Sequence, residues 1–126
     1  MLLLVFSSII MWTEIKLVLP YGHTGYRVLA ADRSTGKLAI IGKDGQIEWT
    51  YENKHDVHDL HMLPNGNILT HINHTTVVEI NPNKEIVWKY ESKPKEFYTG
   101  KVEVHAFQRL NNGLTMIAES GNCRII

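Results

Sequence analysis

The side chains in this sequence that are best able to do chemistry are its histidines. There are seven, and six of them lie between His55 and His105. His55, His58 and His61 follow one another at intervals of three residues, which on a helix would align three imidazoles as in a metal site. On a β-strand, His55 and His61 would share one face and His58 would point to the other. The element that carries these residues therefore decides whether they can converge.

The elements around the histidines form a repeat. The segment around Trp49 recurs around Trp88, 39 residues later, and the segment around His58 recurs around His105, 47 residues later. A period near ~40 residues, built from short strands and tight turns, is typical of the four-stranded antiparallel blades of β-propellers. The sequence therefore predicts an all-β chain, in which the histidines lie on strands and turns. We expect them to be solvated or hydrogen-bonded, and to form no metal site.

Turn-forming residues divide the repeat into blades. Four predicted strands between 55 and 91, at 57–63, 68–72, 75–80 and 85–90, make one complete blade. Incomplete blades are expected at about 27–52, with strands at 27–31, 37–41 and 46–51, and at about 104–126, with a strand that begins at 104 and further segments at 114–118 and 124–126. The domain at 27–126 is thus predicted to be a β-propeller fragment with one complete and two partial blades, part of a larger protein. The unpaired edge of an incomplete sheet could bind another chain. Self-association at that edge is therefore expected.

Aromatic residues recur in the last strand of each predicted blade. Trp88 and Tyr90 are two residues apart, as are Trp49 and Tyr51, so each pair points to one face of its strand. Large rings on one face predict that each sheet packs onto the next.

His58 and His105 occupy the same place in the repeat. The first strand of a propeller blade lines the central channel, where the two imidazoles could act as acid, base or anion ligand. The alternative is that a histidine repeated in every blade hydrogen-bonds a neighbouring strand or turn. Both interpretations stay open, and His58 and His105 are the candidate catalytic residues.

Composition narrows the range of partners. Thirteen basic and thirteen acidic side chains cancel, so nothing favours nucleic acid as a partner. Cys123 is the only cysteine, which excludes an internal disulfide, and we expect its side chain to be buried.

The N-terminal segment, 1–26, begins with an apolar stretch at 1–12. It is similar to the hydrophobic part of a secretory signal, but it has no preceding basic residue and no clear cleavage site. It is shorter than the ~20 residues that span a bilayer, so no membrane span is expected. The segment is interpreted as a degraded signal, a membrane-proximal segment or an extra strand. A signal would make the protein periplasmic or extracellular.

The segments 55–69 and 77–90, with the Leu-Pro-Asn-Gly-Asn turn at 63–67, resemble the blades of bacterial arylsulfotransferase-like and pyrroloquinoline-quinone (quinoprotein)-like β-propellers. The resemblance extends over about 27–126. In arylsulfotransferases a histidine near the channel carries a sulfuryl group, and the resemblance places that role on His58. Residues 30–40 are similar to the tryptophan-docking repeat of quinoproteins, but Ile40 stands where that repeat has tryptophan. No cofactor is expected.

The expected function is a binding or scaffold module for an unknown small-molecule or protein ligand, without enzymatic activity of its own. The alternative is arylsulfotransferase-like sulfuryl transfer through a channel histidine.

Overall fold

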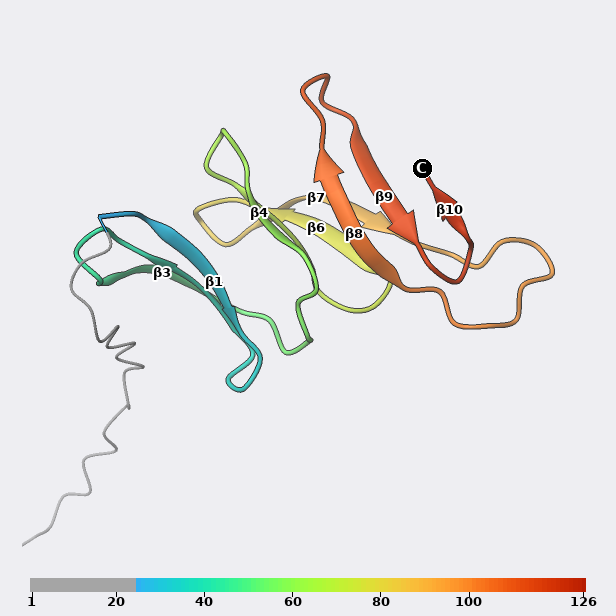
Figure 1. The fold of residues 1–126 in the computed structure, drawn as a ribbon, viewed down its shortest axis with the longest axis horizontal. Coiled ribbons are helices and arrows are strands. Elements are labelled where there is room, and N and C mark those ends of the chain that lie inside the picture. Colours follow the sequence, from blue (N-terminus) through green and yellow to red (C-terminus); the bar gives the residue numbers. More distant parts are fainter. Residues whose placement is uncertain (1–24) are drawn as a thin grey trace, which may run out of the picture.

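A computed structural model describes residues 25–126, and within this part all regular elements are β-strands. Ten strands of this range form three antiparallel sheets, which follow one another in chain order (Figure 1). Sheet 1 contains β1 (Val28–Asp32), β2 (Lys37–Ile41) and β3 (Ile47–Glu52). Sheet 2 contains β4 (Leu60–Met62), β5 (Ile68–His71), β6 (Thr76–Ile80) and β7 (Ile86–Glu91). Sheet 3 contains β8 (Val104–Arg109), β9 (Thr115–Glu119) and β10 (Arg124–Ile125). The prediction of an all-β chain is confirmed.

The repeat of the sequence is also a repeat of backbone geometry. The turn before β3 contains a hydrogen bond from the Gly45 N–H to the Gly42 carbonyl, and the turn before β7 contains the same bond from Lys84 to Asn81. The ladders β2–β3 and β6–β7 each have a register shift at equivalent residues. Sheet 1 therefore corresponds to β5, β6 and β7 of sheet 2.

Sheet 3 corresponds to the first three strands of sheet 2. The Gly66 N–H donates to the Leu63 carbonyl in the turn before β5, and the Gly113 N–H donates to the Leu110 carbonyl in the turn before β9. These pairs are separated by the same 47 residues as His58 and His105. The three sheets contain three, four and three strands, and none of them closes on itself within residues 25–126.

The aromatic pairs pack between the sheets, as predicted. Trp49 and Tyr51 of sheet 1 lie against a buried cluster that includes Ile68 of sheet 2. Trp88 and Tyr90 of sheet 2 lie against the larger cluster shared by sheets 2 and 3, which contains Leu63, Leu69, Val77, Val104, Phe107 and Ile117. Sheets 1 and 2 thus each bury one face against the next sheet, and apolar burial of this kind is the main stabilising contribution to such a stack.

Two local predictions were wrong. Residues 57–59 are not part of a strand, since β4 begins at Leu60 and the backbone nitrogen of His58 faces the His71 side chain. The Asp59 carboxylate accepts hydrogen bonds from the Leu60 and Phe107 N–H groups, so side chains take the place of a ladder here. Cys123 is exposed, because it lies in a tight turn closed by a hydrogen bond from its N–H to the Ser120 carbonyl.

The predictions for residues 1–24 lie outside the described part of the chain. Within residues 25–126 there is no helix that is long and apolar enough to cross a membrane.

Candidate functional site

The two histidines predicted from the repeat lie side by side. His58 is in the segment before β4 and His105 is in β8, and the centroids of their rings are 5.5 Å apart with an interplanar angle of 52°. A third histidine, His71 at the end of β5, lies 5.5 Å from His58 at an angle of 65°. His58 and His105 are exposed, whereas His71 is buried. We call His58, His71 and His105 the histidine cluster.

The backbone between sheets 1 and 2 positions this cluster. The Asn53 side chain donates a hydrogen bond to the His71 carbonyl at 2.8 Å. The Nε2 atom of His71 lies 2.8 Å from the Asp56 carbonyl oxygen and 3.0 Å from the His58 backbone nitrogen. The tautomer decides which contact is a hydrogen bond: a protonated Nε2 donates to Asp56, and an unprotonated Nε2 accepts from His58. Either way, the segment 56–58 is held against β5.

Burial sets the charge of His71. Its side chain is almost completely enclosed, and this desolvation lowers the pKa of the imidazole below its ordinary value of 6.5. The hydrogen bond to the Asp56 carbonyl opposes the shift, and the nearby His58 adds to it. Because desolvation dominates, His71 is neutral at neutral pH. Its Nδ1 atom is buried without a hydrogen-bond partner.

The histidines spaced by three do not converge. The Nε2 atom of His61 lies 2.8 Å from an Asp59 carboxylate oxygen, and the His61 ring packs edge-on against Phe107. His55 is exposed, and its backbone nitrogen lies 3.5 Å from the Asn53 side-chain oxygen. Within residues 25–126, no group of three or more His, Cys, Asp or Glu side chains could hold a metal ion.

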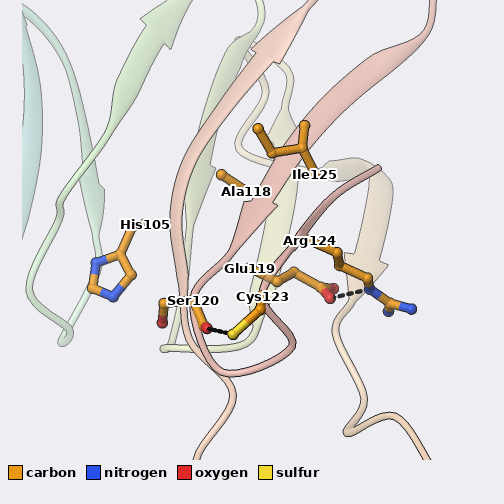
Figure 2. A pocket seen from close by; sticks show the side chains of 7 residues that line it. All are labelled: His105, Ala118, Glu119, Ser120, Cys123, Arg124 and Ile125. Atoms are coloured by element: carbon orange, nitrogen blue, oxygen red, sulfur yellow. Dashed lines mark hydrogen bonds and ion pairs between the residues drawn. The ribbon is translucent and has the colours of Figure 1, made fainter.

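A shallow pocket of about 350 Å³ lies on sheet 3 beside His105 (Figure 2). Its lining residues come from β8, β9 and β10 and from the turn between β9 and β10. The lining residues are His105, Ala118, Glu119, Ser120, Cys123, Arg124 and Ile125.

One lining residue, Glu119, has a side chain that is inaccessible to solvent. Its carboxylate accepts four hydrogen bonds. Oε1 accepts hydrogen bonds from the hydroxyls of Tyr90 and Ser92, both at 2.5 Å. Oε2 accepts from the Asn122 amide and the Arg124 guanidinium, both at 2.6 Å. Burial by itself would raise the pKa of Glu119, but these four donors, Arg124 foremost, lower it to about 2.

The sequence of the chain matches no family model and no curated protein. The resemblance to arylsulfotransferase-like and quinoprotein-like propellers therefore stays a prediction, as does the role that it implies for His58. The geometry offers two exposed imidazoles, which can exchange protons or contact an anion. Beside them lies a buried, neutral imidazole that holds the segment carrying His58.

Two members of these sites were missed in the sequence. His71 could have been found from the register of the β4–β5 hairpin, in which Leu60 pairs with Thr70, because this register places residue 71 next to the segment that carries His58. Glu119 carried no such signal, because two of its partners, Tyr90 in β7 and Ser92 directly after β7, are 29 and 27 residues away.

Proposed function

We propose that the chain is a β-propeller-type repeat module that acts as a binding or scaffold domain for a small-molecule or protein ligand. The observation that carries the proposal is the use of one sheet-to-sheet contact twice. Sheet 1 packs an aromatic pair onto sheet 2, and sheet 2 packs the equivalent pair onto sheet 3. A stack built by repeating one contact is an architecture suited to presenting extended surfaces.

Buried polar groups support the same interpretation, because they hold sheets together. The Glu119 carboxylate joins Tyr90 and Ser92 at the end of sheet 2 to Asn122 and Arg124 of sheet 3. Charge-assisted hydrogen bonds of this kind are about twice as strong as neutral ones. They fix the spacing of two sheets.

A second buried carboxylate acts in the same way. Glu79 of β6 accepts hydrogen bonds from the Asn67 amide and from Arg109 of β8, both at 2.6 Å. The Arg109 guanidinium also lies 5.0 Å from the centre of the Trp88 ring, within the range of a cation–π contact. These contacts join sheets 2 and 3, and we place the ligand contacts on the exposed groups around them.

The exposed part of the histidine cluster is the proposed ligand-contacting surface. His58 comes from the segment before sheet 2 and His105 from sheet 3, so a ligand that touches both rings bridges two units of the repeat. Two adjacent imidazoles can donate hydrogen bonds to an anionic group when they are protonated.

The second candidate function is sulfuryl transfer, which is favoured by the exposure of His58 and its position beside His105. In that reaction an imidazole nitrogen of His58 would form a bond to the sulfur of an aryl sulfate. The bond from sulfur to the aryl oxygen would break, and the phenolate would leave. A phenol oxygen would then take the sulfuryl group from the imidazole and lose its proton to solvent.

One probe, 4-nitrophenyl sulfate, separates the two functions. We expect it to shift the imidazole NMR signals of His58 and His105, and we expect no release of 4-nitrophenol with phenol as acceptor. Release that is lost in His58→Ala and kept in His74→Ala, an exposed histidine outside the cluster, would establish transfer instead. If neither imidazole signal moves, the cluster is not a ligand surface.

A further inference from the structure

Each sheet of the stack has two different faces. The rear face points to the preceding sheet and the forward face to the following one. In sheet 2, Ile68 lies on the rear face, in the cluster shared with sheet 1. Leu69 and Val77 lie on the forward face, in the cluster shared with sheet 3. In both observed contacts, a forward face packs onto a rear face.

Within residues 25–126, the forward face of sheet 3 carries exposed apolar side chains. Met116 stands 47 residues after Leu69, at the same place in the repeat, and it is 39% exposed whereas Leu69 is fully buried. Ile125 pairs with Ala118 as Val77 pairs with His71. Its side chain is 69% exposed, whereas Val77 is fully buried. Side chains that sheet 2 buries thus have exposed apolar counterparts in sheet 3.

The rear face of sheet 1 is apolar as well. Val28 pairs with Ile41, and Ala30 pairs with Ala39, so these four side chains share the face opposite Leu38 and Ile40. They correspond to four residues of sheet 2 that are all buried: Ile68, Thr70, Val78 and Ile80. Val28 is 39% exposed, and the other three side chains are half-buried.

We infer that the forward face of sheet 3 docks onto the rear face of sheet 1 in a second copy of this chain, head to tail. The inference rests on the proposed binding or scaffold function and names its partner. It continues the forward-to-rear order in which sheet 1 meets sheet 2 and sheet 2 meets sheet 3, although sheet 3, as described, has no counterpart of the aromatic pair. In both contacts within the chain a forward face packs onto a rear face, so the contact between two copies would also join two different surfaces. Its repetition closes a ring or extends a chain of copies, depending on the rotation between neighbours.

Complementation between two variants of the full chain tests this inference. Ile125→Glu places a charge on the forward face, and Val28→Glu places one on the rear face. Burial of an unpaired charge is costly, so each substitution should weaken self-association by about a hundredfold. Sedimentation velocity over a series of concentrations measures it. Val87→Glu is the matched control, because Val87 is 52% exposed and lies in β7, outside both open faces.

The expected result is that the unsubstituted chain and Val87→Glu associate, and that each end-face variant alone is monomeric. An equimolar mixture of Ile125→Glu and Val28→Glu should form a one-to-one dimer, since one intact face of each kind remains. Circular dichroism of each variant establishes that it is folded.

Three outcomes would overturn the inference. A monomeric unsubstituted chain would mean that the partner is a different protein, and it would leave the binding function standing. Dimers of either variant alone would show a face that binds itself. Association unaffected by both substitutions would place the contact at strand edges or elsewhere. Failure of the binding function is a separate result, since it is detected when 4-nitrophenyl sulfate moves neither the His58 nor the His105 imidazole NMR signal.

Discussion

The hydroxyl of Tyr90 in sheet 2 donates a hydrogen bond of 2.5 Å to the carboxylate of Glu119 in sheet 3. Burial and this hydrogen bond raise the pKa of Tyr90, so the hydroxyl keeps its proton and remains a donor. The same carboxylate accepts three further hydrogen bonds. A single buried acidic side chain therefore links the two sheets.

Removal of this carboxylate should destabilise the protein strongly. Glu119→Ala leaves the Tyr90, Ser92 and Asn122 donors without their acceptor, and we expect a loss of about 3 kcal/mol in the free energy of unfolding. Urea denaturation measures the change. Glu91→Ala is the matched control, because Glu91 is exposed and its ion pair with Lys89 spans 3.4 Å. It should alter stability by less than about 0.5 kcal/mol. Equal effects of the two substitutions would contradict this role for Glu119.

Acid should weaken the same contact. The pKa of Glu119 falls from its ordinary value of 4.5 to about 2 on folding, so the folded state holds the carboxylate in its charged form. The resulting stabilisation is complete above pH 4.5 and is lost as the pH falls from there to about 2. It amounts to about 3 kcal/mol. Urea denaturation at a series of pH values should show this loss, and Glu119→Gln should remove that part of the slope.

The turn before β7 should be improved by glycine. Lys84 has a φ of +69°, whereas the equivalent position in the turn before β3 is Gly45 with a φ of +79°. A side chain is strained in this left-handed conformation. We expect Lys84→Gly to raise the free energy of unfolding by about 1 kcal/mol and Gly45→Ala to lower it by about as much.

Open space around Gly45 makes that comparison clean, because a Cβ atom there would have no neighbour within 4 Å. The loss in Gly45→Ala would therefore come from the backbone alone. Thermal unfolding of both variants measures the two effects. A decrease in stability in Lys84→Gly would show that the lysine side chain contributes more than its conformation costs.

His71 should resist protonation. Desolvation lowers its pKa below 6.5 in the folded protein, so the unfolded chain takes up this proton first and stability should decrease as the pH falls below 6.5. NMR titration of the imidazole signals gives the midpoint directly, and His74→Gln assists assignment by removing one exposed histidine. A titration midpoint of His71 at or above pH 6.5 would contradict the burial of its imidazole.

Much of the fold could be predicted because its signals are local. Turn residues and alternating apolar side chains located nine of the ten described strands closely, and β2 (Lys37–Ile41) without error. β4 was predicted too long because Asp59 bonds the N–H of Phe107, 48 residues away. A contact between residues so far apart in the chain cannot be predicted from the neighbouring residues.

The candidate site also contains residues that local signals revealed and residues that they did not. His58 and His105 were found because the repeat places them at equivalent positions, and the structure brings their rings within 5.5 Å. Whether they act in the repeat's architecture or on a ligand was left open by the sequence. His71 and Glu119 derive their properties from burial, which depends on how the sheets stack.

The sequence by itself determined that this chain is all-β, where its turns lie, and that its units repeat, because these properties depend on neighbouring residues and on the alternation of strand faces. Only the tertiary structure decided which groups share an environment. Glu119 carries a charge in the interior because four donors from two sheets converge on it, and His71 is neutral because residues far from it in the chain exclude water. Met116 and Ile125 stay exposed where their counterparts in sheet 2 are buried, since burial requires a neighbouring sheet as well as an apolar side chain.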